Sequence, residues 1–223
     1  MTASRYIVFE GGEGCGKSTQ SQILAAALGD NAVLTREPGA TAIGASLRGI
    51  LLAPETGDLD PRTETLLMAA DRAQHIVEVV RPALAAGHHV VSDRSVYSSL
   101  AYQGHGRGLS VDEIRRVSEW ATHGVWPDLV LLLQLARTED ESAVPGEPVA
   151  PGPGSLGNVA HHAGAVLHDR FETAGTDFLQ RVNAGFRALA AAEPDRIVSV
   201  DGGGTIDEVA ARVRHVVAER LNL

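Results

Sequence analysis

Residues 11–18 read Gly11-Gly12-Glu13-Gly14-Cys15-Gly16-Lys17-Ser18, and this stretch fits the phosphate-binding pattern G-x-x-x-x-G-K-[ST] in full. Glycines at these positions let consecutive backbone N–H groups turn toward a phosphate, and the N-terminus of a following helix adds partial positive charge. Lys17 is the only lysine in the chain, which indicates that its ammonium group has a specific function in this loop. Lysine in this pattern reaches the β- and γ-phosphates, and Ser18 can coordinate Mg²⁺. The stretch therefore predicts a nucleotide-binding site that extends to Thr19.

The residues on either side of the phosphate loop agree with this interpretation. Tyr6–Phe9 is an apolar run typical of a buried strand entering the loop, and Ser18–Leu28 has the pattern of an amphipathic helix leaving it. Gly29 is placed to be the C-cap of that helix. Cys15 occupies a variable position of the pattern, and we interpret it as a small side chain that fills space.

Composition restricts the class of protein. With 223 residues, 44% of them hydrophobic, the chain can bury one α/β core, with a lid or subdomain at most. A net charge of -9 argues against a nucleic-acid backbone or an anionic membrane surface as the main partner, because both need a basic face. One cysteine, no apolar run of bilayer length and a strand close to the N-terminus in place of a signal peptide predict a cytoplasmic protein.

Short apolar runs alternate with longer helical patterns along the chain. The predicted strands are Tyr6–Phe9, Ala32–Thr35, His89–Ser92, Leu129–Leu135 and Arg196–Val200. The predicted helices are Ser18–Leu28, Ala42–Leu52, Pro61–Ala86, Val111–Thr122, His168–Ala192 and Thr205–Leu221. This alternation predicts an α/β fold with a five-stranded parallel sheet and helices on both faces.

In such folds ligands bind beyond the carboxyl ends of the strands, so the residues that follow each strand are candidates for function. Asp93 ends the apolar run Val90–Ser92, which is the Walker-B arrangement of a carboxylate held near Mg²⁺. Arg94 comes next and is expected to point into the same cleft. Asp93 and Ser18 are therefore the predicted metal ligands.

The segment 138–166 is rich in Pro, Gly and acidic residues and contains neither Lys nor Arg. It predicts a mobile or disordered loop. Its position before the helix that ends at Ala192 suits a lid that closes over the phosphates, and an inert insertion explains the same composition equally well.

Several further motifs occur in a fixed order along nearly the whole chain, and together they resemble the bacterial thymidylate kinase family. They are Glu10-Gly11, Thr35-Arg36-Glu37-Pro38-Gly39, Leu47-Arg48, Leu51-Leu52, Asp71-Arg72, Asp93-Arg94, Ala101-Tyr102-Gln103-Gly104, Gly106-Arg107-Gly108, Pro127-Asp128-Leu129 and Asp169-Arg170-Phe171-Glu172.

The resemblance implies the fold of P-loop nucleoside-monophosphate kinases with a lid segment, a homodimer, and transfer of the γ-phosphoryl of ATP to dTMP with Mg²⁺. By the same resemblance, Arg94 and Arg72 hold the acceptor phosphate, and Asp201–Thr205 lies near the adenine. The remaining residues implied to bind substrate are Glu13 near the sugar, Arg36 to Pro38 beside the thymine, Tyr102 and Gln103 along the nucleoside, and Ser98. The acceptor phosphate is mostly a dianion at neutral pH, so the transfer needs positioning and charge neutralisation and no general base.

The chain departs from the family in ways that bear on function. Met68 stands where the family usually stacks a phenylalanine on the thymine, and Ser95 stands where Tyr or His crowds the sugar 2′ position. The loop residues Gly12 to Cys15 carry no arginine, and neither does the chain between Arg137 and Arg170. An arginine that neutralises the transferring phosphoryl contributes about 10³ to 10⁵ in rate. We therefore expect Arg137 or Arg170 to move in when the lid closes.

Two other functions remain open from the residues. Met68 and Ser95 are compatible with a kinase of another pyrimidine nucleoside monophosphate, such as dUMP or dCMP. A lid without arginines is compatible with a regulatory protein that binds nucleotide without turnover. A GTPase is disfavoured, because the chain has no Asn-Lys-x-Asp segment to read guanine.

Overall fold

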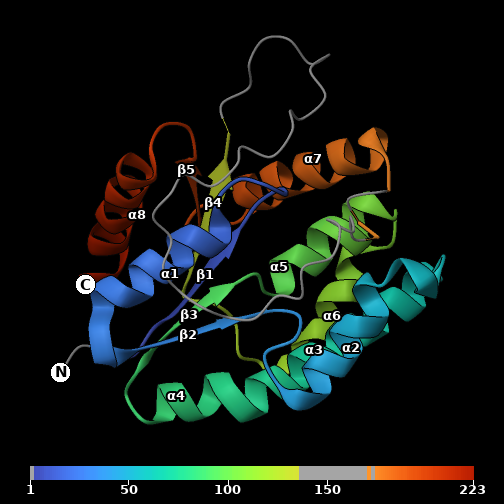
Figure 1. Cartoon of the computed structure of the whole chain (residues 1–223), viewed down its shortest axis with the longest axis horizontal. Helices are drawn as coiled ribbons and strands as arrows, with labels where there is room; N and C mark the ends of the chain where they lie inside the picture. Colours follow the sequence, from blue (N-terminus) through green and yellow to red (C-terminus); the bar gives the residue numbers. More distant parts are fainter. Residues whose placement is uncertain (1–2, 136–169, 172–173) are drawn as a thin grey trace, which may run out of the picture.

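The computed structural model describes residues 3–135, 170–171 and 174–223, and Figure 1 shows how their strands and helices are arranged. The predicted loop at 138–166 and Arg137 lie outside the described residues. Five parallel strands form one sheet in the order β2-β3-β1-β4-β5. The predicted five-stranded parallel sheet is therefore confirmed.

Strands and helices follow the predicted order closely. The strands are β1 (Tyr6–Glu10), β2 (Ala32–Arg36), β3 (His89–Asp93), β4 (Leu129–Gln134) and β5 (Ile197–Asp201). The long helices are α1 (Lys17–Leu28), α2 (Ala42–Leu52), α3 (Pro61–His75), α6 (Val111–Thr122), α7 (Thr176–Ala192) and α8 (Ile206–Leu221). Short helical segments are η1 (Gly29–Asn31), η2 (Pro54–Thr56), η3 (Ile76–Val80), α4 (Arg81–Ala85), α5 (Val96–Ser99) and η4 (Leu100–Gly106).

Two of the predicted helices differ from the observed elements, and one observed helix was not predicted. The helix predicted at Pro61–Ala86 is present as α3, the π-helical segment η3 and α4. The start predicted at His168 is wrong, because residues 170–171 form a turn and Gly175, at a φ of 91°, is the N-cap of α7. The helix formed by α5 and η4 was not predicted. It contains two glycines, which weaken helix propensity, and its packing against α7 offsets that loss.

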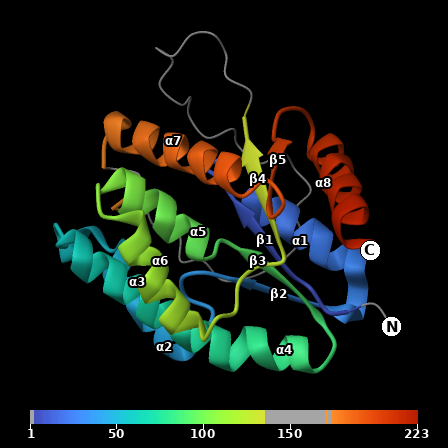
Figure 2. The same ribbon diagram turned by 180° about the vertical axis from the view of Figure 1, so that it is seen from behind.

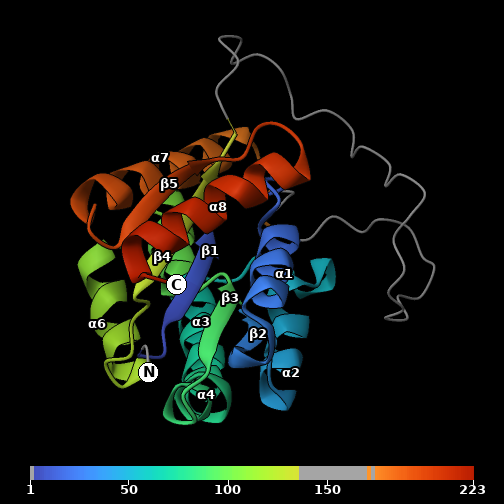
Figure 3. The ribbon, with the colours of Figure 1, turned by 90° about the vertical axis from the view of Figure 1, so that its left-hand side faces the viewer.

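Alternate residues of the strands face opposite layers of helices, as the two-residue period of a strand requires. On one face, Ile7, Phe9 and Leu131 pack against α1 and α8, which lie in front of the sheet in Figure 3. On the other face, Tyr6 and Val8 pack against η3 and α4. Val130 and Leu132 pack there against α5, η4 and α7, and Figure 2 shows α5, α6 and α7 together from behind. Helices thus cover both faces of the sheet, as predicted.

The parallel register brings the carboxyl ends of the three central strands together. Phe9 of β1 is paired with Asp93 of β3 and with Leu131 of β4. Gly11 follows β1 at a φ of 140°, and a Cβ atom there would lie 2.4 Å from the carbonyl oxygen of Leu133. Only glycine allows the phosphate loop to leave the sheet this close to β4. Within the described residues, no helix is both long and apolar enough to cross a bilayer.

Candidate functional site

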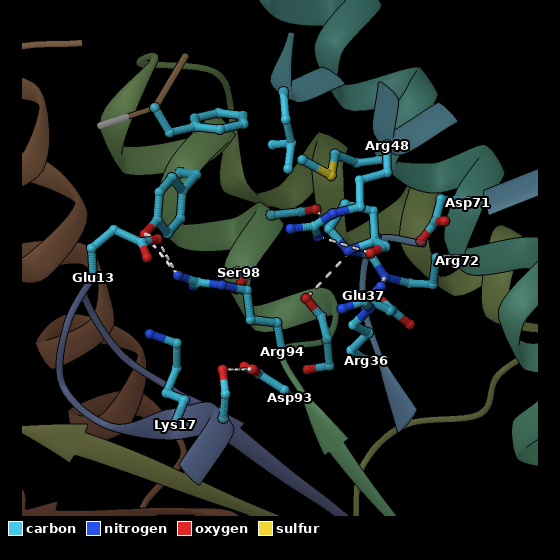
Figure 4. A pocket seen from close by; sticks show the side chains of 18 of the residues that line it. Glu13, Lys17, Arg36, Glu37, Arg48, Asp71, Arg72, Asp93, Arg94 and Ser98 are labelled. Atoms are coloured by element: carbon cyan, nitrogen blue, oxygen red, sulfur yellow. Dashed lines mark hydrogen bonds and ion pairs between the residues drawn. The ribbon is translucent and has the colours of Figure 1, made fainter. Parts of the chain in front are cut away.

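A cavity of about 430 Å³ opens at the carboxyl edge of the sheet (Figure 4). Glu13, Gly14 and residues 16–19 of the phosphate loop line it. The predicted substrate-binding residues all line it as well, namely Glu13, Arg36, Pro38, Met68, Arg72, Arg94, Ser98, Tyr102 and Gln103. The structure therefore brings residues from distant parts of the sequence into one site.

The phosphate loop leads directly into α1. Gly14 and Gly16 have positive φ values of 72° and 89°, and Gly16 is the N-cap of the helix. Lys17 is 6% exposed, and its Nζ donates to the carbonyl oxygen of Gly12 at 2.5 Å. Cys15 is buried in the core, and its Sγ donates to the same oxygen at 3.1 Å. The position of Cys15 agrees with a space-filling role.

Asp93 and Ser18 contact each other in the wall of the cavity. The Oγ of Ser18 donates to Oδ2 of Asp93 at 2.5 Å, while Oδ1 of Asp93 is buried and has no hydrogen-bond partner among the described residues. A buried carboxylate oxygen without a partner is costly unless a ligand satisfies it. Hard cations such as Mg²⁺ take oxygen ligands, commonly one or two from the protein. This pair therefore fits the Mg²⁺ of a bound nucleotide.

Arg94 crosses the cavity between the phosphate loop and the helix formed by α5 and η4. It has a φ of 71°, which is uncommon for a residue other than glycine. Its Nη2 donates to Oε1 of Glu13 and, at 3.3 Å, to the hydroxyl of Tyr102. Burial alone would raise the pKa of Glu13, but Arg94 and Lys17 outweigh burial and leave that pKa below its ordinary value. Arg94 thus carries a fixed positive charge at the phosphate end of the site.

Glu10 fixes the turn that presents Arg94. Its side chain is fully buried and accepts hydrogen bonds from the backbone N–H and the hydroxyl of both Ser95 and Ser98. Ser98 in turn accepts a hydrogen bond from Nη1 of Arg94 at 3.1 Å. Burial raises the pKa of Glu10, although Arg94 and the two serines oppose that rise. Sequence analysis noted Glu10 only as part of a motif and did not predict this role.

Arg72 lies on the opposite side of the cavity from Lys17 and Glu13 (Figure 4). Its Nε donates to Oε2 of Glu37 at 2.9 Å, and the other oxygen of Glu37 lies 2.8 Å from Nδ1 of His75. Burial alone would raise the pKa of Glu37, but Arg72 and His75 lower it below its ordinary value. Glu37 lines the cavity within the segment Arg36 to Pro38 that was expected beside the thymine, whereas Asp71 also lines it and was not predicted as a site residue.

Two further arginines contribute charge to the cavity. The side chain of Arg36 is exposed and forms no hydrogen bond or ion pair within the described part of the chain. Arg48 was not predicted as a site residue, and its Nη1 donates to the carbonyl oxygen of Pro38 at 3.0 Å. The signal for Arg48 was its place in α2, one turn before Leu52, which also lines the cavity.

Some predicted site residues lie elsewhere. Gly11, Gly12 and Cys15 line a smaller cavity of about 180 Å³ between the phosphate loop and α7. Arg170 lines neither cavity, because it is buried against Glu64 at 2.6 Å. The backbone N–H of Gly202 donates to the carbonyl oxygen of Gln134 at 2.7 Å, which places the start of the 201–205 segment beside β4.

Replacing Arg72 or Arg36 with alanine compares the contributions of a buried and an exposed charge to the free energy of unfolding. Arg72→Ala leaves Glu37 buried without its ion pair, so we expect it to lower the free energy of unfolding by about 3–5 kcal/mol. Arg36→Ala removes an exposed side chain and is expected to change it by no more than about 0.5 kcal/mol. Urea unfolding measures both, and equal effects would contradict the description of Arg72 as a buried ion-pair partner.

Comparison with known proteins identifies the family of the chain. Residues 9–143 match the family model described as thymidylate kinase. A thymidylate kinase of Synechococcus sp. (strain JA-3-3Ab) is 46% identical over 97% of this chain and 96% of its own length. A thymidylate kinase of Solidesulfovibrio magneticus is 44% identical over 97% of this chain and 100% of its own. The crystal structure of thymidylate kinase from Ehrlichia chaffeensis superimposes with a TM-score of 0.73 at 28% identity, covering 96% of this chain and 98% of that one. The chain therefore belongs to the thymidylate kinase family.

Proposed function

We propose that this protein transfers the γ-phosphoryl group of ATP to dTMP, giving dTDP and ADP. The observation that carries the proposal is the meeting of a phosphate loop, an unpartnered carboxylate oxygen and a second set of cations in one cavity. The phosphate loop suits the donor, and the half of the cavity that contains Met68, Arg72 and Gln103 suits the acceptor nucleoside. Relatives named thymidylate kinase support this assignment.

On the donor side, Lys17 and the N–H groups of the phosphate loop would bind the β- and γ-phosphates of ATP. Ser18 and Asp93 would hold the Mg²⁺ that accompanies ATP, and Oδ1 of Asp93 is free to do so. When bound, Mg²⁺ supplies charge neutralisation between the β- and γ-phosphates. Lys17 must then release the Gly12 carbonyl oxygen, its partner in the structure.

On the acceptor side, Arg94 would hold the phosphate of dTMP, with Arg36 as a second cation within reach of the cavity. Arg72 was expected beside the same phosphate. Because Arg72 lies across the cavity from Lys17 and bonds to Ser99 on the helix that carries Gln103, we assign it to the base. Glu13 would lie near the sugar, and Ser98 and Tyr102 would act by orienting Arg94.

The chemistry asks little of the protein beyond placement and charge. An oxygen of the dTMP phosphate attacks the γ-phosphorus of ATP, the bond from that phosphorus to the bridging β–γ oxygen breaks, and ADP leaves. The attacking phosphate is mostly a dianion at neutral pH, so no base is needed. Further charge neutralisation by Arg137 or Arg170 stays a prediction. Arg170 would first have to break its ion pair with Glu64.

The proposed assembly follows the family resemblance, and the proposed location and the exclusion of nucleic acid and membranes as partners follow from composition and charge. We propose a homodimer in the cytoplasm, with ATP and dTMP as the small-molecule partners and no nucleic acid or membrane. Trp120 of α6 is 82% exposed, which is unusual for so large an apolar side chain, and a second copy of the chain would cover it.

ADP formation from Mg-ATP with dTMP, dUMP, dCMP, UMP, dGMP and AMP as acceptors tests the proposed activity. We expect dTMP to be preferred. We expect Lys17→Ala to lower kcat by about 100-fold or more, because it removes the ammonium group that neutralises negative charge on the phosphates. A different preferred acceptor would make the protein a kinase of that nucleotide. Binding of ATP without turnover on any acceptor would favour the regulatory alternative.

The Mg²⁺ dependence of the rate tests the role of Asp93. We expect Asp93→Asn to raise the Mg²⁺ concentration that gives half-maximal rate by about tenfold or more, because an amide is a weaker ligand than a carboxylate. Asp71→Asn is the matched control. Asp71 also lines the cavity, but its Oδ1 accepts from the N–H of Gly39, so its replacement should leave the Mg²⁺ dependence unchanged. Equal shifts in both variants would exclude Asp93 as the metal ligand.

A further inference from the structure

Glu64 of α3 is a fully buried carboxylate with an unusually complete set of partners. Its Oε1 accepts from Nε2 of Gln103 at 2.9 Å and from Nε of Arg107 at 3.3 Å. Its Oε2 accepts from Nη2 of Arg170 at 2.6 Å and from Nη2 of Arg107 at 3.1 Å. Glu64 lines neither cavity, so it does not itself touch a ligand there.

The contact with Glu64 decides which way the side-chain amide of Gln103 faces. Carboxylate oxygens only accept hydrogen bonds, so the atom that Gln103 turns toward Glu64 must be its Nε2. The amide oxygen Oε1 then faces away, and it has no hydrogen-bond partner in the part of the chain that the structure describes. Gln103 lines the central cavity, so it presents a hydrogen-bond acceptor to a ligand.

Arg72 of α3 presents hydrogen-bond donors close to Gln103 of η4. Glu64, Met68 and Arg72 follow one another at four-residue spacing along one face of α3. Nη2 of Arg72 donates to the hydroxyl of Ser99 and to the carbonyl oxygen of Ser95, and Nε donates to Glu37. These bonds leave both N–H groups of Nη1 without a partner among the described residues. Ser99 lies four residues before Gln103, so the donor of Arg72 and the acceptor of Gln103 are neighbours, with Met68 beside them.

A donor beside an acceptor matches one edge of a pyrimidine base. Thymine and uracil present the 4-carbonyl as an acceptor next to N3–H as a donor. Cytosine presents a 4-amino donor next to an N3 acceptor, so both of its groups would face groups of the same kind. Unpaired polar groups in a buried site are the strongest source of discrimination between such ligands.

We propose that Glu64 is a positioning residue that fixes the amide of Gln103 and thereby makes the site select a pyrimidine with N3–H over cytosine. The inference rests on the proposed function, because it places the acceptor base at Arg72 and Gln103. Arg170 holds Glu64 in place, which gives Arg170 a part in the site without contact to the phosphates.

Glu64→Gln is the sharpest test. Arg170 and Arg107 both donate to the Oε2 position, whereas only the longer bond from Nε of Arg107 reaches Oε1 beside Gln103. The amide oxygen of the new side chain would therefore take the Oε2 position, and its NH₂ group would face Gln103. Gln103 must then turn over and offer Nε2 to the cavity, which suits the N3 acceptor of cytosine. We expect the ratio of kcat/KM for dTMP to that for dCMP to fall by about tenfold or more.

Arg107→Gln is the matched control. It removes two of the hydrogen bonds to Glu64 but leaves the contact between Glu64 and Gln103. We expect this variant to keep the dTMP-to-dCMP ratio of the unchanged protein, even where its stability falls. A Glu64→Gln variant that is folded and keeps the original ratio would overturn the proposal, as would an equal change in Arg107→Gln.

Binding of N3-methyl-dTMP to the unchanged protein tests the same orientation where Glu64→Gln does not fold. The methyl group removes the N3–H donor, so we expect binding about tenfold or more weaker than that of dTMP, and Gln103→Leu should reduce this difference. Equal affinities for the two ligands would overturn the proposal. Absence of phosphorylation of dTMP by the unchanged protein would instead mean that the proposed function has failed.

Discussion

The parallel pairing of β1 with β3 is the constraint on which the rest of the site depends. It aligns Phe9 with Asp93, and the N–H of Arg94 donates to the carbonyl oxygen of Phe9 at 2.9 Å. The phosphate loop and the pair Asp93-Arg94 therefore leave the sheet side by side, although more than seventy residues separate them. Nothing in the phosphate loop alone would distinguish a kinase from another nucleotide-binding protein. In the proposed function, Asp93 and Arg94 at the end of the adjacent β3 would supply the second half of the chemistry.

Three buried glutamates hold the polar side chains of the cavity in place. Glu10 fixes the turn and the serine that orient Arg94, Glu37 holds Arg72, and Glu64 holds Gln103. A buried carboxylate is costly, and each of these accepts hydrogen bonds from several donors that offset the cost. Side chains held in this way need little rearrangement when a ligand arrives. Such preorganisation favours both affinity and the alignment that phosphoryl transfer requires.

Local sequence patterns were sufficient for the sheet and for the residues of the phosphate loop, because strand runs and glycine spacing are properties of short segments. They were not sufficient for the helix formed by α5 and η4, whose glycines weaken the helical pattern and which is held by packing against α7. The same limit applies to Glu10 and Glu64. Neither lies in a pattern that indicates burial, and their partners are distant in sequence. The ion pair of Arg170, which was expected to move toward the phosphates, was missed for the same reason, since it joins Glu64 across 106 residues.

In the proposed function one cavity holds both substrates, with phosphates at Lys17, Asp93 and Arg94 and the base at Arg72 and Gln103. A crystal structure with dTMP, Mg²⁺ and a non-transferable ATP analogue tests it most directly. The account predicts that the dTMP phosphate lies on Arg94 and faces the γ-phosphate of the analogue, with Mg²⁺ on Oδ1 of Asp93. A dTMP molecule bound outside this cavity, or with its phosphate remote from Arg94, would contradict the account.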